Sequence, residues 1–120
     1  MTLRLTILGC ASSGGVPRVG EGWGACDPAN PKNRRLRCSV LVERSGSQGA
    51  TSVLVDTSPD LREQLIGAEV KRLDGVLLSH PHADHTHGID DLRPLCLAMR
   101  RRLNVHMNAQ TSLKIGRAHV

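Results

Sequence analysis

Three histidines and one aspartate fall within six consecutive positions of this chain, as His80, His82, Asp84 and His85. The cluster begins two residues after the apolar run at residues 76–78, which predicts a short buried strand. In extended backbone His80 and His82 point to the same side, and a following turn lets Asp84 and His85 reach the same region. The segment therefore predicts a polar site at the end of a buried strand.

This combination of side chains is typical of metal ligation. Neutral imidazole suits zinc and iron, carboxylate suits harder ions such as manganese, and a mixture fits two ions roughly 3.5–4 Å apart. We predict two divalent metal ions, zinc or manganese, bound by His80, His82, Asp84 and His85, with Asp84 also the candidate catalytic residue. The alternative interpretation is a polar loop with a pH-sensitive histidine cluster.

Other histidines fit the metal site less well. His87 is expected to support the ligands and His106 to lie on the surface.

Strands are predicted on both sides of a long loop. Leu3, Leu5 and Ile7 alternate with polar residues, which predicts a strand with one buried face that ends at Gly9. Residues 9–37 favour turns, and such a long loop inside a domain is usually functional or mobile. Further strands are expected at residues 38–43, 52–56 and 103–107.

Two helices are predicted between these strands. The first begins with Ser58 as cap and Pro59 in the first helical position, and Gly67 closes it. The second covers residues 90–102, with a break or restart at Pro94. Strands followed by strand-helix units, without an internal repeat, indicate an α/β or α+β layered domain.

Length and composition restrict the class of protein. A chain of 120 residues fits one domain or part of one. The N-terminus has no charged region ahead of an apolar stretch, and no run approaches the ~18 apolar residues of a membrane span, so we expect a soluble cytoplasmic protein without a membrane partner. The four cysteines show no close-spaced pair, which favours reduced thiols over a disulfide framework.

The net charge of +5 comes mainly from two basic clusters, at residues 32–37 and 100–102. Each cluster either attracts phosphate groups or keeps a surface solvated, and the solvated surface is the more common case. Trp23 is the only aromatic residue among Phe, Tyr and Trp, whereas single-strand binding usually needs stacking platforms. We therefore expect a small phosphodiester as partner rather than nucleic acid; the oligomeric state stays open.

The motif at residues 80–85 resembles the metal motif of the metallo-β-lactamase superfamily, and residues 53–57 resemble its earlier strand ending in aspartate. More narrowly, residues 8–18, 33–39 and 84–93 are similar to the branch that contains the phosphoribosyl cyclic phosphate phosphodiesterase. The resemblance covers nearly everything before Lys114. It implies an α/β fold, the αββα sandwich of that superfamily, of which this chain would form the N-terminal half.

The resemblance also implies roles for the residues. His80 and His82 would bind the first metal, Asp84 and His85 the second, and a metal-bridging hydroxide would attack phosphorus. Asp56 would either hold a ligand histidine through its other ring nitrogen or cap the following turn.

Some family features are missing from this sequence. The branch can carry a cysteine cluster for a structural zinc in its first loop, but only Cys26 is present there, so no structural zinc is expected. Residues 9–15 lack a P-loop ending, which favours turn-forming glycines over a nucleotide cradle. The later ligands of the family are not identifiable, so we expect residues 1–114 to be the N-terminal part of the domain, marginally folded and inactive on its own.

The final six residues, Ile-Gly-Arg-Ala-His-Val at 115–120, follow no family pattern. The codons ATC-GGA-AGA-GCA-CAC-GTC encode them and match the start of a common short-read sequencing adapter. We expect this tail, including His119, to be derived from the adapter, which the nucleotide record tests directly.

The expected function is a metal-dependent hydrolase of cyclic or small phosphodiesters. Within the same fold the alternatives are a tRNA 3′-processing-type endonuclease and a thioester or lactam hydrolase. A non-catalytic metal- or phosphate-binding protein is the alternative from another class.

Overall fold

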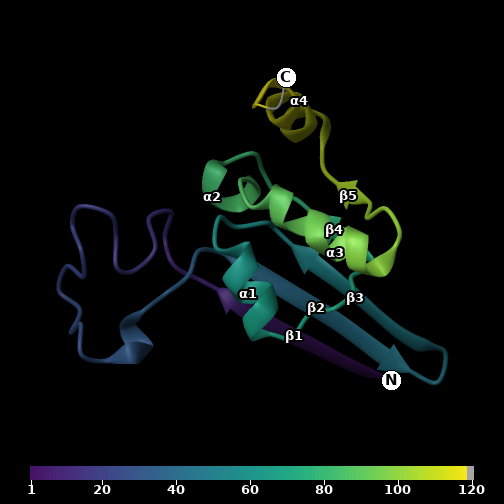
Figure 1. The fold of residues 1–120 in the computed structure, drawn as a ribbon, viewed down its shortest axis with the longest axis horizontal. Helices are drawn as coiled ribbons and strands as arrows, with labels where there is room; N and C mark the ends of the chain where they lie inside the picture. The colour runs from purple at the N-terminus through teal and green to yellow at the C-terminus, as the bar shows by residue number, and fades with distance from the viewer. Residues whose placement is uncertain (119–120) are drawn as a thin grey trace.

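The computed structural model describes residues 1–118, which form a five-stranded sheet in the order β1-β2-β3-β4-β5 (Figure 1). The strands are β1 (Thr2–Gly9), β2 (Ser39–Gly46), β3 (Gly49–Val55), β4 (Gly75–Leu77) and β5 (Val105–His106). Strands β1, β2 and β3 are antiparallel neighbours, whereas β3, β4 and β5 are parallel. The mixed α/β class predicted from the sequence is confirmed.

The helices are α1 (Leu61–Gly67), α2 (Ala83–Thr86), α3 (Leu92–Met99) and α4 (Ala109–Ala118), with 3₁₀ turns η1 (Pro31–Asn33) and η2 (Ile89–Asp91). Helix α1 connects β3 to β4, α2 and α3 connect β4 to β5, and α4 follows β5. Both α1 and α3 lie over the same side of the sheet (Figure 1). In the described residues, no helix combines the length and the apolar character that a membrane span requires.

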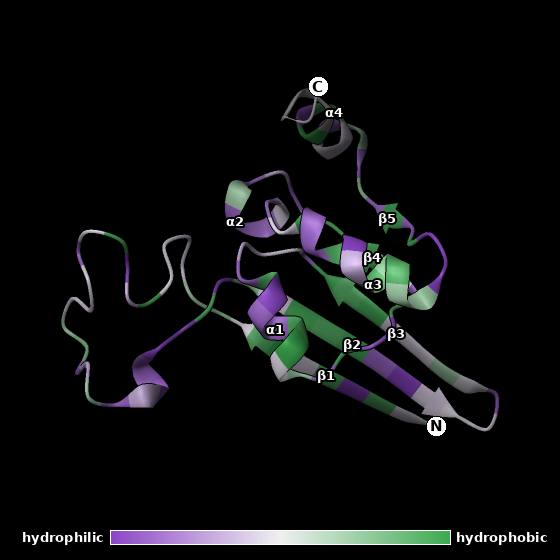
Figure 2. Ribbon diagram, in the orientation of Figure 1, coloured by the Kyte–Doolittle hydropathy of each residue, from purple (hydrophilic) through white to green (hydrophobic). Residues whose placement is uncertain are grey.

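The core lies between the sheet and these two helices. Leu54 and Val76 from the central strands are fully buried, as is Leu61 from α1. Leu92 and Leu95 of α3 complete the contact, and the strand segments beneath the helices are the hydrophobic part of the sheet (Figure 2). One helical layer and one sheet layer thus share a single apolar interface.

The prediction of a buried apolar face on β1 is wrong. Leu3, Leu5 and Ile7 do lie on one face of β1, but they are 65%, 62% and 63% exposed rather than buried. The alternation correctly predicts the apolar face, because side chains on a strand point to opposite sides in turn. Nothing in residues 1–118 packs over that face, so the apolar face of β1 stays open.

The strand and loop predictions agree with the structure in outline. The two runs at 38–43 and 52–56 form the β2–β3 hairpin, with Gly46 paired to Gly49 at its turn. Residues 10–38 run away from the sheet as a long loop (Figure 1), tied down by single backbone bridges such as Val16 with Arg35.

Both helix predictions hold in outline, with shifted bounds. Helix α1 begins at Leu61, after a turn at Pro59, yet the Ser58 hydroxyl accepts from the Asp60 N–H at 3.1 Å, as the predicted cap would; Gly67 ends the helix as predicted. The predicted helix at residues 90–102 is the 3₁₀ turn η2 followed by α3, which ends at Met99. Pro94 lies in the first turn of α3, where a missing N–H costs no intrahelical bond, so of the two alternatives the structure has the restart.

The four cysteines are free thiols, as predicted. Residues 115–118 of the proposed adapter-derived tail lie in α4, and 119–120, including His119, lie outside the described residues.

Candidate metal centre

The site forms where two parallel strands end side by side. Strands β3 and β4 are neighbours in register, so the residues that follow them emerge at the same edge of the sheet. The first residue after β3 is Asp56, whose N–H donates to the Leu77 carbonyl at 2.8 Å. Ser79 and His80 follow β4. Residues far apart in sequence thereby meet at one sheet edge.

Asp56 sits at the centre of this edge. Its side chain is 4% exposed, and its backbone has a left-handed φ of 67°, which aspartate tolerates better than most residues. The Ser39 hydroxyl donates to the Asp56 carbonyl oxygen at 2.8 Å and helps to fix this conformation. The backbone thus directs a buried carboxylate toward the histidine cluster.

The Asp56 carboxylate orients His85. Its Oδ2 lies 2.7 Å from Nδ1 of His85. Because a carboxylate accepts, we assign the proton to Nδ1, which leaves the Nε2 lone pair of His85 for a metal ion.

The same carboxylate acts on His80 through Ser79. The Ser79 N–H donates to Oδ1 of Asp56 at 2.8 Å, and the Ser79 hydroxyl donates to Oδ2 at 2.7 Å. That hydroxyl also lies 2.8 Å from Nδ1 of His80, and because its own hydrogen goes to Asp56, we assign it as the acceptor of a hydrogen bond from the Nδ1–H. One buried carboxylate therefore sets the same tautomer in two imidazoles, both with Nε2 free of a proton.

The side chains of the predicted ligands converge in space. The ring centroid of His80 lies 4.7 Å from that of His82 and 4.1 Å from that of His85. Oδ2 of Asp84 lies 3.2 Å from Nε2 of His85. Within the described chain, Asp56, His80 and His85 each offer a ligand atom, and these atoms lie within 4.8 Å of one another. The set of nitrogen and oxygen donors fits a divalent metal ion.

Backbone contacts hold the short helix α2 against this edge. The Thr57 N–H donates to the His85 carbonyl at 2.9 Å, and the Thr57 hydroxyl donates to the Thr86 carbonyl at 3.2 Å. The Gly88 N–H returns to the Thr57 carbonyl at 3.0 Å. A Cβ at Gly88 would overlap the Ser58 carbonyl oxygen. Glycine at position 88 therefore permits the close approach that places His85.

Of the four predicted ligands, His80 and His85 belong with Asp56 to the group of three donors, whereas His82 and Asp84 lie beside it, next to His80 and His85 respectively; metal ligation by all four stays a prediction. Of the two roles considered for Asp56, its bond to His85 is the one seen in the structure. Sequence reasoning missed Ser79, whose only signal is its place between the strand and His80. His87 bonds to Thr86 beside the cluster, and His106 lies in β5; neither belongs to the group of three donors.

A cysteine thiol lies near the same edge. Burial raises the pKa of the Cys38 thiol, and the nearby carboxylates of Asp56 and Asp84 raise it further. In the absence of a metal ion Cys38 is therefore a protonated thiol at neutral pH.

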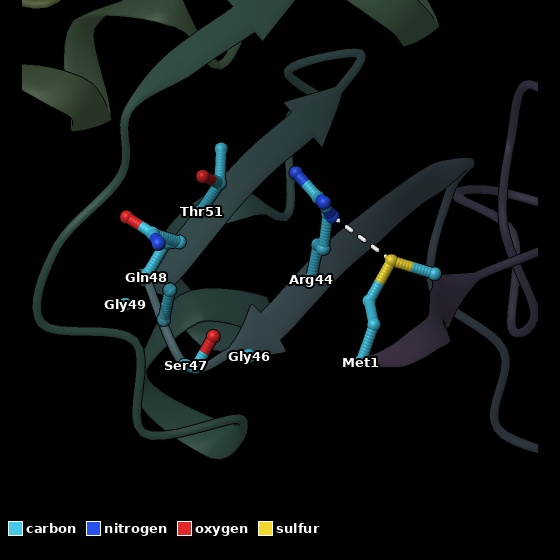
Figure 3. A pocket seen from close by; sticks show the side chains of 8 residues that line it. Met1, Arg44, Gly46, Ser47, Gln48, Gly49 and Thr51 are labelled. Carbon is cyan, nitrogen blue, oxygen red and sulfur yellow. Dashed lines mark hydrogen bonds between the residues drawn. The ribbon is translucent and has the colours of Figure 1, made fainter.

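A hollow lies at the other end of the sheet, away from the metal centre. It is bordered by the β2–β3 turn, with Arg44 donating to the Met1 sulfur at 3.0 Å (Figure 3). Strand β3 starts at this hollow and ends at Val55, just before Asp56, so the length of the strand separates the two places. Of its lining residues only Arg44 carries a charged side chain, which makes it a poor candidate for the chemistry.

Comparison with known proteins agrees with this geometry. Residues 51–118 match the family model of the β-lactamase superfamily domain. The chain belongs to this superfamily. The family resemblance noted in the sequence is therefore confirmed. Members of the metallo-β-lactamase fold typically bind divalent metal ions and are generally hydrolases.

Several relatives are similar over most of this chain. A diphosphatase from the PhnP family shares 36% identity with a TM-score of 0.85, over 98% of this chain and 46% of its own. An octanoyltransferase of Porphyromonas gingivalis is 35% identical, over 93% of this chain and 22% of its own length. Zinc-bound PqqB of Methylobacterium extorquens, at 19% identity and a TM-score of 0.66, shares the fold. The chain thus spans less than half the length of these relatives.

Proposed function

We propose that this chain carries the first metal-binding segment of a hydrolase that cleaves small phosphodiesters, cyclic ones included. The observation that carries the proposal is the pair of imidazoles, His80 and His85, whose Nδ1 atoms are both committed to the Asp56–Ser79 arrangement. Both Nε2 atoms are then acceptors, which is the state that a metal ion requires.

The proposed ligands are His80, His82, Asp84 and His85. Two divalent ions, zinc or manganese, would supply an acidic water and positive charge opposite the phosphoryl oxygens. Asp56 and Ser79 keep the two imidazoles in a fixed tautomer and orientation, so little reorganisation accompanies binding. Asp84, beside His85, is the carboxylate proposed to serve in catalysis as well as in ligation.

Hydrolysis of a diphosphate is the second candidate. The diphosphatase from the PhnP family, at 36% identity and a TM-score of 0.85, favours it. Both candidate reactions place a phosphoryl group at the same proposed metal site, so they differ only in the substrate.

The test is activity of the full-length protein, loaded with zinc or manganese, on a panel of substrates. The panel contains cyclic phosphates, bis(p-nitrophenyl) phosphate, a diphosphate diester, precursor tRNA, a thioester and a lactam. We expect turnover of the phosphate esters or the diphosphate, and its loss together with metal binding in His82→Ala. Turnover confined to the thioester or the lactam contradicts the proposal, and turnover of precursor tRNA alone supports the nuclease alternative.

A further inference from the structure

One arginine of the basic cluster at residues 32–37 is not a solvated surface charge. The Arg37 side chain is 29% exposed, whereas that of Arg34 is 59% exposed and makes a single contact at 3.4 Å to Glu63. Arg37 thus differs from its neighbour in the same loop, and it needs a separate explanation.

The Arg37 guanidinium is held rigidly by Asp60. Nε donates to Oδ2 of Asp60 at 2.9 Å, and Nη2 donates to Oδ1 at 2.8 Å, which is the bidentate geometry that arginine and carboxylate favour. The backbone N–H of Arg37 donates to the same carboxylate at 2.9 Å. These bonds leave Nη1 without an acceptor among residues 1–118.

A buried network fixes the backbone of Arg37 as well. Its carbonyl accepts from Nε2 of Gln64 at 2.7 Å, and Oε1 of Gln64 accepts from the Ser58 hydroxyl at 2.8 Å. Gln64 is 4% exposed and Ser58 is fully buried. Salt bridges on a protein surface contribute little to stability. The two buried polar side chains behind Arg37 are therefore more support than a surface salt bridge needs.

Arg37 lies beside the metal centre. Ser39, two residues further along, bonds to the backbone of Asp56 at 2.8 Å. The hydrogen bond that Arg37 donates to Asp60 is the main cause of a raised pKa for Arg37, and the Asp84 carboxylate raises it further. A preorganised guanidinium therefore lies two residues from the strand position that contacts Asp56, near the edge of the sheet that carries the predicted ligands.

We propose that Arg37 binds a phosphate oxygen of the substrate and positions it against the metal centre. The proposal rests on the function proposed above, since it specifies how that site recognises its substrate class. A planar guanidinium whose orientation is already fixed loses little entropy when a phosphate binds. Asp60 acts as the positioning partner, and Nη1 is the donor that remains for the anion.

The test uses the full-length protein and inorganic phosphate as the probe, with and without bound zinc, in calorimetric titrations. A hydrogen bond from a charged donor is worth about 1.5–3 kcal/mol, so Arg37→Gln should weaken phosphate binding by roughly 10- to 150-fold. Arg34→Gln, with the same change in the same loop, is the matched control and should stay within about twofold. Arg37→Lys should recover part of the affinity.

A second measurement does not depend on a folded variant. Phosphate should slow the modification of Arg37 by phenylglyoxal in the wild-type protein, read by peptide mass mapping, and leave Arg34 unprotected. Equal phosphate affinity in wild type and Arg37→Gln, or no protection of Arg37, overturns the inference. Phosphate binding that depends on Arg37 in a protein that binds no metal would overturn the proposed function and leave only the phosphate-binding role of Arg37 standing.

Discussion

Replacing Asp56 by asparagine changes one atom and removes the acceptor that two imidazoles depend on. The carboxylate accepts three donors from two residues, Ser79 and His85, at 2.7–2.8 Å. An amide has one oxygen. If that oxygen faces the Ser79 N–H, the amide NH₂ faces His85, which must then accept through Nδ1 and carry its proton on Nε2. If the amide is reversed, two N–H groups oppose each other at Ser79.

The magnitude follows from the bond that is lost. In either orientation at least one charge-assisted hydrogen bond disappears, worth about 1.5–3 kcal/mol, and 1.36 kcal/mol is a factor of ten. We therefore expect metal affinity to fall by roughly 10- to 100-fold, the usual range for partners behind a metal ligand. Ser79→Ala should give a smaller loss, because it disturbs only His80.

The assay is equilibrium dialysis of the full-length protein against zinc, followed by metal analysis. Asp27→Asn is the matched control: Asp27 lies in the exposed loop, and an amide oxygen can still accept from the Ala29 N–H at 3.0 Å. Its zinc affinity should equal that of the wild type. If Asp56→Asn also binds zinc with wild-type affinity, the tautomer argument is refuted.

Two further predictions concern stability. Gly88→Ala should lower the free energy of unfolding by about 1–3 kcal/mol or more, because its Cβ overlaps the Ser58 carbonyl, whereas Gly67→Ala, with open space around it, should be neutral or stabilising in chemical denaturation. The pKa of Asp60 is lowered chiefly by its bond from Arg37, and that of Asp74 chiefly by its bond from the Ser52 N–H. A depressed carboxyl pKa stabilises the fold above the unfolded value of about 3.9 and loses that contribution as pH falls through the folded pKa. The melting temperature of the wild type should therefore fall steeply below about pH 4, and that of Asp74→Asn should fall less over the same range. The same dependence of melting temperature on pH in both proteins would contradict this.

Local patterns predicted the strands and their apolar faces, but not what covers each face. The alternation in β1 marks Leu3, Leu5 and Ile7 as one face, and only the three-dimensional arrangement shows that α1 and α3 pack on the other. Whether a face is covered depends on contacts between distant segments, which periodicity does not contain.

The start of α1 shows the same limit at one residue. The Ser58 hydroxyl accepts from the Asp60 N–H, as a cap does, but it also donates to Gln64, and the Asp60 side chain at the assigned cap position is engaged by Arg37, 23 residues earlier in the chain. A capping rule reads neighbouring residues, so it cannot foresee a distant competitor.

The site was predictable where its residues are consecutive. The spacing of His80, His82, Asp84 and His85 indicates the cluster from the sequence alone. The role of Ser79 was not predictable, because it depends on the parallel pairing of β3 with β4.

We propose that histidine and carboxylate side chains of this chain bind the metal, which X-ray absorption at the zinc edge of the full-length, zinc-loaded protein can test. We predict nitrogen and oxygen neighbours of zinc at about 2.0–2.1 Å, with the outer scattering of imidazole, and fewer imidazoles in His82→Ala. Sulfur scattering at about 2.3 Å, which would assign the ligands to cysteines such as Cys38, or an unchanged imidazole count in the variant, would contradict it.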